Sequence, residues 1–202
     1  MRVAIIKLGV GNTASVLFAL ERLGVTGVLT DDPAAVADAE RVILPGVGAA
    51  APAMRMLNAS GLRDVLLDFA RPLLGICLGQ QLLYEHSEEG DAKGLGRLSG
   101  NVTALPSTKR LPIPHMGWSR VHPTRAHPLW QGIDDGTRFY FAHSFFPVPE
   151  DAAVTAATTD YPAPFTCAIA QANIFATQFH PEKSQRGGLA LLANFVAWNG
   201  RE

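Results

Sequence analysis

The stretch 72–83 constrains the chain more than any other, because an apolar run ends there at a cysteine placed between two glycines. The run is typical of a buried parallel strand, and good helix formers follow over 82–85. Gly75 and Gly79 permit a sharp strand-to-helix turn in which Cys77 takes a strained backbone conformation. We therefore expect Cys77 to stand clear of the sheet at a helix N-terminus, where the helix dipole favours the thiolate.

A lone cysteine among apolar residues is more commonly a small buried side chain than a nucleophile. The flanking glycines favour the nucleophile, since a core cysteine needs no such turn. Much later in the chain, His180 is followed after one proline by Glu182. A nucleophilic cysteine needs a base, and the base needs a group that orients it. A His-x-Glu pair alone is also typical of a solvated surface, so the prediction of Cys77, His180 and Glu182 as a catalytic triad depends on both stretches.

Composition limits the class of protein. A length of 202 residues suits a single domain over 1–202, and 48% hydrophobic with 17% charged residues is typical of a globular chain. The net charge of −1, without a basic stretch, argues against nucleic acid as a partner. Two cysteines are too few for a disulfide framework, and Cys167, which lacks flanking glycines, is expected in the core. We see no signal peptide or membrane-spanning run, so we expect no membrane contact and a cytoplasmic location.

Strand-like and helix-like patterns alternate through the first half of the chain, and a run of short strands follows before a terminal helix. The order predicts an α/β fold with an open, mostly parallel central sheet, helices on both faces and an antiparallel extension. The expected strands are 3–8, 25–30, 42–44, 102–105, 138–147, 154–157, 166–171 and 175–179, and the expected helices lie within 13–24, 33–39, 51–69 (broken near 60–61) and 187–198. The polar, glycine-rich segment 88–96 is expected to be a solvated surface loop.

Two glycine-containing turns follow predicted strands. Pro45-Gly46-Val47-Gly48 follows the strand 42–44, at the strand end where open α/β sheets place ligand sites. Its glycines let backbone N–H groups approach a ligand as an oxyanion hole requires, although a plain turn is the alternative. The turn 9–12 matches a dinucleotide-binding fingerprint only loosely. We expect neither a nucleotide cofactor nor a metal.

Two further histidines are candidate bases. His115 lies among apolar and proline residues, where a structural histidine with satisfied hydrogen bonds is the commoner case. His143 has no carboxylate close in sequence. Neither displaces His180 as the predicted base.

These motifs resemble those of a known family. Gly75-Ile76-Cys77-Leu78-Gly79-Gln80-Gln81 resembles the G-x-C-x-G-x-Q turn of the class I glutamine amidotransferases, which have a flavodoxin-like sheet, and the sequence at 180–182 resembles their H-P-E. More narrowly, the chain resembles the glutaminase subunits of imidazole glycerol phosphate synthases, enzymes of histidine biosynthesis. That narrower resemblance spans essentially all of the chain and rests on the segments 45–48, 115–118, 143–145 and 180–185.

The resemblance implies a reaction and a partner. Glutamine would be hydrolysed to glutamate and ammonia. The ammonia would pass to a (β/α)8-barrel synthase (cyclase) subunit, the partner in a heterodimer, which forms imidazole glycerol phosphate and an aminoimidazole carboxamide ribotide. The turn 9–12 would lie on the face that meets this partner. The backbone N–H groups of Leu78 and of Val47 or Gly48 would form the oxyanion hole. The implied substrate-binding residues are Gly46, Gln81, His143, Ser144 and Phe145.

Three other interpretations remain at this point. The chain could supply ammonia to another synthase, making anthranilate, pyridoxal phosphate or a purine precursor; the segments 115–118 and 183–185 argue against this. It could be a non-catalytic regulatory or binding subunit, against which the intact Cys77, His180 and Glu182 argue. It could be a cysteine hydrolase with a substrate other than glutamine, which turnover of glutamine against other amides and esters would distinguish.

Overall fold

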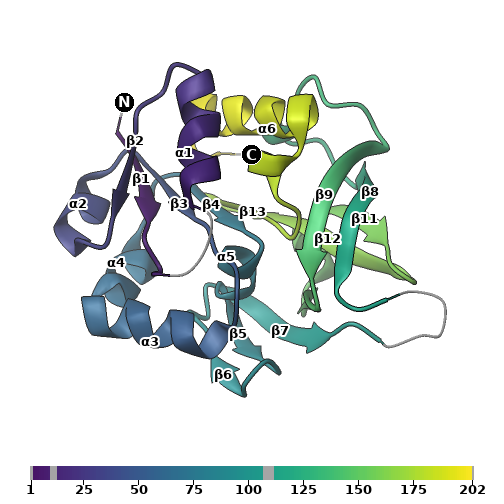
Figure 1. Ribbon diagram of the computed structural model, residues 1–202, viewed down its shortest axis with the longest axis horizontal. Coiled ribbons are helices and arrows are strands. Elements are labelled where there is room, and N and C mark those ends of the chain that lie inside the picture. Colours follow the sequence, from purple (N-terminus) through teal and green to yellow (C-terminus); the bar gives the residue numbers. More distant parts are fainter. Residues whose placement is uncertain (1, 10–12, 107–111, 202) are drawn as a thin grey trace.

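The computed structural model describes residues 2–9, 13–106 and 112–201 (Figure 1). A large sheet forms its centre, with the strand order β2-β1-β3-β4-β13-β12-β11-β8-β9. Its strands are β1 (Val3–Ile6), β2 (Gly27–Thr30), β3 (Arg41–Leu44), β4 (Leu73–Ile76), β8 (His115–Pro123), β9 (Thr137–His143), β11 (Thr155–Asp160), β12 (Pro164–Gln171) and β13 (Ile174–Thr177). Residues 10–12 of the turn 9–12, which was expected to face a partner, lie outside the described residues.

The strands of this sheet divide into a parallel and an antiparallel half. Strands β2, β1, β3, β4 and β13 pair in parallel. Strands β12, β11, β8 and β9 continue the sheet through antiparallel pairs. The predicted parallel sheet with an antiparallel extension is confirmed. Strands β1, β3, β4 and β13 are apolar and buried between the helices on the two faces, whereas the edge strand β2 is partly exposed.

Helices lie on both faces of the sheet, as predicted (Figure 1). Successive side chains of β1 show the two layers: Ile5 belongs to a core cluster with Leu20 and Phe195, whereas Ile6 belongs to a second cluster with Leu57. This follows from the alternation of side chains along a strand. One face carries α1 (Thr13–Arg22) and α6 (Gln185–Ala197), and the other carries α2 (Pro33–Asp38), α3 (Ala50–Ser60) and α4 (Leu62–Asp68).

Local sequence signals set several helix limits. The carboxylate of Asp32 accepts a hydrogen bond from the Ala34 N–H at 3.0 Å and so caps α2, which begins at Pro33. Gly61, with a φ of 75°, separates α3 from α4, which confirms the break expected near 60–61. Cys167 on β12 is fully buried, as expected for a core residue.

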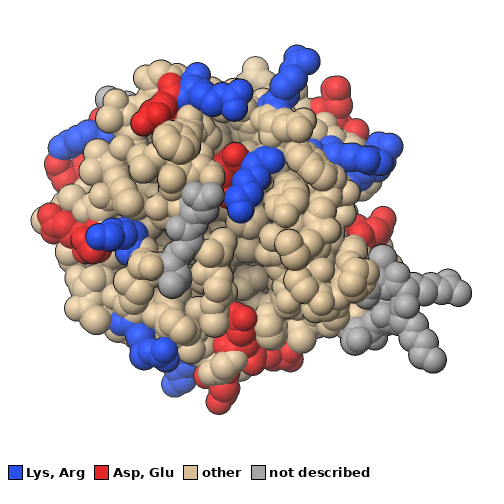
Figure 2. All heavy atoms as spheres, in the orientation of Figure 1, with Lys and Arg blue, Asp and Glu red and all other residues tan. Residues whose placement is uncertain are grey.

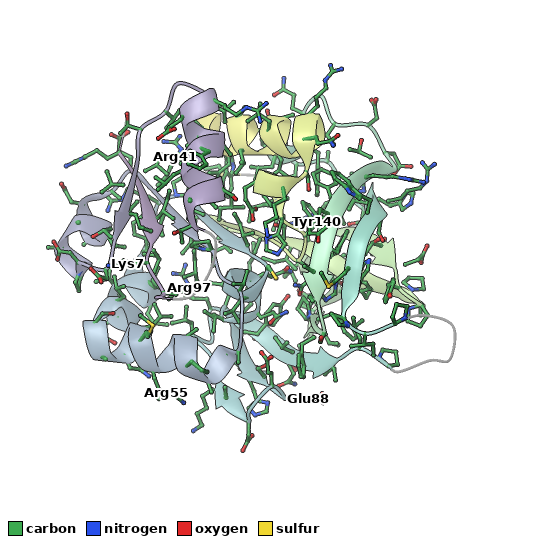
Figure 3. All side chains as sticks on the ribbon, viewed as in Figure 1. Lys7, Arg41, Arg55, Glu88, Arg97 and Tyr140 are labelled. Atoms are coloured by element: carbon green, nitrogen blue, oxygen red, sulfur yellow. The ribbon has the colours of Figure 1, made fainter. Side chains whose placement is uncertain are left out.

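A second sheet was not predicted. It has the order β10-β7-β5-β6. The single strand expected over 138–147 is wrong: β9 and β10 belong to different sheets, and Ser144 lies between them. Arg97, just before β7, donates to the carbonyl groups of Leu66 and Phe69 near the end of α4, at 2.6 Å and 3.2 Å (Figure 3). The strands are β5 (Tyr84–Ser87), β6 (Ala92–Lys93), β7 (Leu98–Ala104) and β10 (Phe145–Pro149).

The helix expected to continue past Cys77 is also shorter than predicted. Helix α5 (Leu78–Gln81) ends after 4 residues, and β5 begins at Tyr84. The carbonyl groups of Leu82 and Leu83 accept hydrogen bonds from later backbone N–H groups, those of Leu95 at 2.8 Å and Leu98 at 3.0 Å. Tertiary hydrogen bonds therefore replace the helical ones. So short a helix contributes little dipole field at Cys77.

Short 3₁₀ helices complete the described structure: η1 (Pro128–Trp130), η2 (Ala152–Val154) and η3 (Pro181–Lys183). Within the described residues, no helix is long and apolar enough to cross a membrane. Acidic and basic side chains are interspersed on the face that Figure 2 shows.

The close packing of α5 on β3 gives a test of the fold. A Cβ on Gly79 would lie 1.7 Å from the carbonyl oxygen of Leu44, whereas a Cβ on Gly24 would meet nothing within 4 Å, although Gly24 has a φ of +70°. We expect Gly79→Ala to lower the free energy of unfolding by about 3 kcal/mol or more, by overpacking. Gly24→Ala should cost only the left-handed strain of about 1 kcal/mol. Urea unfolding of both variants measures this, and equal losses would contradict the packing argument.

Candidate active site

Three neighbouring strands bring the predicted residues to one edge of the sheet. Strand β4 lies between β3 and β13 and is parallel to both. It leads into Cys77, while β13 leads into the segment 178–182 and β3 leads into the loop 45–48. Because parallel strands present their carboxyl ends at the same edge, these segments converge there.

The backbone at Cys77 is strained as the sequence predicted. Its φ of 53° and ψ of −109° lie outside the regions that non-glycine residues favour. The Cys77 N–H donates to the carbonyl of Thr177 at 2.7 Å, which ties the turn to β13. The close approach of Gly79 to β3 holds it from the other side. The side chain is 5% exposed and lines a cavity.

His180 and Glu182 form a buried pair beside this turn. The Nδ1 atom of His180 lies 2.7 Å from an Oε1 oxygen of Glu182, and both side chains are at most 4% exposed. Helix η3 carries Glu182, and Gly188 of α6 packs so closely on it that a Cβ there would lie 1.8 Å from the Pro181 carbonyl oxygen. The His180 N–H donates to the Tyr140 carbonyl at 2.9 Å, which anchors the segment to β9.

The charges around His180 outweigh its burial. Burial alone lowers the pKa of the imidazole, but the negative charges of the Cys77 thiolate and the Glu182 carboxylate raise it to about 10. Since Glu182 accepts from Nδ1–H, Nε2 is the ring nitrogen left for the Cys77 sulfur. No hydrogen bond of ordinary geometry joins Nε2 to any described residue. The raised pKa keeps the His180 ring positively charged near pH 7.

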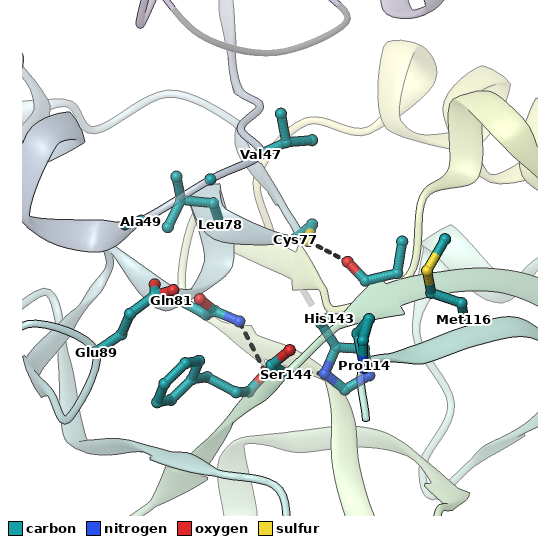
Figure 4. A pocket seen from close by; sticks show the side chains of 13 residues that line it. Val47, Ala49, Cys77, Leu78, Gln81, Glu89, Pro114, Met116, His143 and Ser144 are labelled. Carbon is teal, nitrogen blue, oxygen red and sulfur yellow. Dashed lines mark hydrogen bonds between the residues drawn. The ribbon is translucent and has the colours of Figure 1, made fainter. Parts of the chain in front are cut away.

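Two protein groups lie close to the Cys77 sulfur. The side-chain Nε2 of Gln178 donates to Sγ at 3.5 Å. The carbonyl oxygen of Ala142, on β9, lies 3.9 Å from Sγ and accepts from the neutral thiol (Figure 4). Sequence analysis did not single out Gln178, because nothing in the sequence places its side chain against the sulfur.

A cavity of about 430 Å³ opens onto the sulfur (Figure 4). Every predicted oxyanion-hole and substrate-binding residue lines it except Gly46. A Cβ on Gly46 would lie 3.0 Å from the Leu78 Cβ, so Gly46 packs against the turn at Cys77 and does not face the cavity. The lining residues are Val47, Gly48, Ala49, Cys77, Leu78, Gln81, Glu89, Pro114, Met116, Ala142, His143, Ser144 and Phe145.

The two alternative histidine bases, His115 and His143, are hydrogen-bonded to each other. His115 Nδ1 and His143 Nε2 lie 3.0 Å apart, and His143 Nδ1 donates to the Phe145 carbonyl at 2.8 Å. His115 Nε2 contacts the hydroxyl of Ser119 at 2.9 Å. Burial lowers the pKa of His115 to about 4 and that of His143 to about 3, so both rings are neutral near pH 7. Neither has a nitrogen left to act on a substrate.

Gln81 presents an acceptor to the cavity. Its Nε2 donates to the Phe145 carbonyl at 2.9 Å and to Oε1 of Gln178 at 3.0 Å, so both hydrogens of the amide group are used. Its Oε1 remains to meet a ligand. Gln81 is therefore placed to accept a hydrogen bond from a ligand and not to donate one.

Glu89 is a cavity residue that the sequence did not reveal. The segment 88–96 reads as solvated surface, yet Glu89 lines the cavity, and its Oε2 accepts from the Ala50 N–H at 3.2 Å. Burial raises the pKa of this carboxyl group. Glu89 reaches the cavity because the fold places it beside the start of α3, which the sequence alone does not reveal. Within the described ranges, no three His, Cys, Asp or Glu side chains are arranged to hold a metal.

Comparisons with known proteins show the family and the fold of the chain. The family model described as "Glutamine amidotransferase class-I" matches residues 5–198. Among solved structures, a glutamine amidotransferase superposes with a TM-score of 0.73 at 18% identity, covering 96% of this chain and 97% of that chain. The glutaminase domain of Trypanosoma brucei CTPS with bound acivicin gives 0.66 at 15% identity, covering 98% and 95%. At these identities, the structures show the shared fold alone.

Curated relatives are much more similar. The imidazole glycerol phosphate synthase subunit HisH of Aromatoleum aromaticum is 52% identical, covering 97% of this chain and 98% of that protein. The subunit of the same name from Thiobacillus denitrificans is 50% identical, covering 99% and 92%. The chain therefore belongs to the class I glutamine amidotransferases and, within them, to the family of the HisH subunits of imidazole glycerol phosphate synthase.

Proposed function

We propose that this chain is the glutaminase subunit of an imidazole glycerol phosphate synthase and that Cys77, His180 and Glu182 form its catalytic triad. The observation that carries the proposal is the strained turn at Cys77, which faces a cavity and lies beside a buried His180–Glu182 pair. Full-length relatives at about 50% identity, named as subunits of that synthase, support the choice of reaction.

In this mechanism the Cys77 thiolate attacks the side-chain carbonyl carbon of glutamine. The sulfur–carbon bond forms, and the carbonyl electron pair moves to the oxygen. When the carbon–nitrogen bond breaks, the His180 imidazolium gives its proton to the leaving ammonia. Water, deprotonated by His180, then attacks the glutamyl thioester and releases glutamate and the thiolate. Glu182 holds the imidazole in the required orientation through Nδ1.

The oxyanion of each tetrahedral intermediate needs donors beside Cys77. The N–H of Leu78 follows the nucleophile directly, and the neighbouring loop at Val47 and Gly48 also lines the cavity. Donors of this kind contribute about 3 kcal/mol each when well aimed. Gly48 has a φ of 96°, a conformation that suits glycine.

The cavity suits the charged end of an amino acid. The Glu89 carboxylate and the free Oε1 of Gln81 are both acceptors, which matches an α-ammonium group. The Ser144 hydroxyl is a donor for the α-carboxylate. An amide lacking the amino-acid head group would leave Glu89 without its counter-ion, so glutamine is favoured over simple amides.

Exposed apolar side chains close to the cavity support a partner subunit. Met116 is 64% exposed and Trp118 42% exposed, both on β8, and the Trp118 ring lies 6.0 Å from that of Tyr140. Large exposed apolar groups of this kind mark docking surfaces. We propose that a (β/α)8-barrel synthase subunit binds this face as the other half of a heterodimer and receives the ammonia.

One experiment tests the nucleophile and the partner together. Cys77→Ser should lower glutamate release from glutamine by at least about 10³-fold, because the serine hydroxyl has a far higher pKa than a thiol and stays un-ionised beside the His180 imidazolium. Cys167→Ala, which removes the other, buried thiol, should retain most of the activity. Release is measured for the chain alone and with the barrel subunit and its nucleotide. Near-wild-type activity of Cys77→Ser would reject the triad, and a lack of any glutaminase activity in both mixtures would reject the proposed function.

A further prediction concerns the pH dependence of kcat/KM. The raised pKa of His180 keeps the imidazolium, the proton donor to ammonia, present until the pH rises through about 10. Glu182→Gln removes one of the charges that raise this pKa, so the alkaline limb of kcat/KM should move to lower pH by about 1 to 3 units. Glu150→Gln, which removes an exposed carboxylate, is the matched control. An unmoved alkaline limb in Glu182→Gln would show that Glu182 does not act on His180.

A further inference from the structure

We propose that Gln178 is a hydrogen-bond donor to the Cys77 thiolate and that Gln81 fixes its orientation. The inference rests on the proposed role of Cys77 and adds to it a group outside the triad. Gln178 follows β13 directly and is 0% exposed, two residues before His180. A fully buried amide must find partners for both of its ends, and one of the partners here is the sulfur at 3.5 Å.

The orientation of both amides follows from a group that can only accept. The backbone carbonyl of Phe145 has no hydrogen to donate, so the end of the Gln81 amide that lies 2.9 Å from it is the NH₂ group. The same NH₂ group lies 3.0 Å from the Gln178 side chain, whose facing atom must therefore be the oxygen. The nitrogen of Gln178 is then the end that faces the sulfur. A flipped Gln178 would place two acceptors, its oxygen and the thiolate, against each other.

A chain of buried groups holds that carbonyl in place. His143 Nδ1 must donate to Phe145, so its Nε2 accepts from His115 Nδ1–H, and His115 Nε2 accepts from the Ser119 hydroxyl. Each link therefore has one donor direction, from β8 through His143 at the end of β9 to Phe145 at the start of β10. Because the two rings are buried and neutral, no link reverses near pH 7.

A donated hydrogen bond favours the charged form of the sulfur over the thiol. This matters here because α5 has only 4 residues and offers little dipole field. Gln178 therefore acts with the His180 charge to keep the nucleophile ionised, and it stabilises the same thiolate when it leaves the glutamyl group during thioester hydrolysis. Gln178 does not line the cavity, so it acts on the sulfur and not on bound glutamine.

The test replaces the donor without changing the size of the side chain. Gln178→Met removes the N–H group, and Gln80→Met is the matched control, since Gln80, on α5, is also 0% exposed but its amide makes no hydrogen bond to the described residues. Cys77 alkylation by iodoacetamide is followed by mass spectrometry as a function of pH in a Cys167→Ala background. We expect the thiol titration in Gln178→Met to move to higher pH by about one unit. At pH values below the thiol pKa, alkylation should therefore be about tenfold slower. Gln80→Met should leave it unmoved.

Two further readouts keep the proposal testable. In glutamine hydrolysis by the complete synthase, Gln178→Met should lower kcat about tenfold and leave KM within about twofold, as expected for a group that contacts only the sulfur. If Gln178→Met does not fold, Gln81→Met keeps the donor but frees its orientation, and a smaller shift in the same direction is expected. A folded Gln178→Met with a wild-type alkylation profile would overturn the proposal. If Gln178→Met does not fold, an unchanged alkylation profile in Gln81→Met would overturn it. Alkylation needs no glutamine turnover, so this failure is distinct from failure of the proposed function.

Discussion

The candidate site depends on the parallel pairing of β4 with β3 on one side and β13 on the other. This pairing places the nucleophile, the base and the glycine loop at one edge, although they are far apart in sequence. The backbone bond from Cys77 to Thr177 continues the ladder by one residue past the end of β4 and so fixes the strained turn relative to the strand that leads to His180. A shift in strand register would separate all three.

Three buried histidines show how partners decide a charge. Burial lowers the pKa of each, yet His143 falls to about 3 and His115 to about 4, whereas His180 rises to about 10. The first two contact only neutral groups, so burial prevails. His180 lies between a carboxylate and a thiolate, whose combined attraction exceeds the cost of burying the imidazolium. The same type of side chain is thus a neutral structural link in one place and, in the proposed mechanism, a proton donor in another.

The sequence was informative where function is encoded locally. The glycines around Cys77 and the spacing of His180 and Glu182 predict the turn and the buried pair, because strain and orientation arise within a few residues. The second sheet could not be predicted in this way, since β5 begins where the pattern favours a helix and depends on hydrogen bonds from 95–98. Glu89 escaped notice for the same reason: only the folded chain brings this polar loop residue to the cavity.

The length of α5 changes the physical account of the nucleophile. The dipole of the helix that follows Cys77 was expected to favour the thiolate, but this helix ends after 4 residues, at Gln81. In the proposed mechanism the Cys77 thiolate is stabilised instead by two specific neighbours, the positive His180 and the N–H group of Gln178. A helix dipole would act on any group at the turn, whereas these contacts depend on β13 being in register and on Gln81 being held by Phe145. On this proposal, the ionisation of Cys77 is coupled to correct assembly of the strands around it.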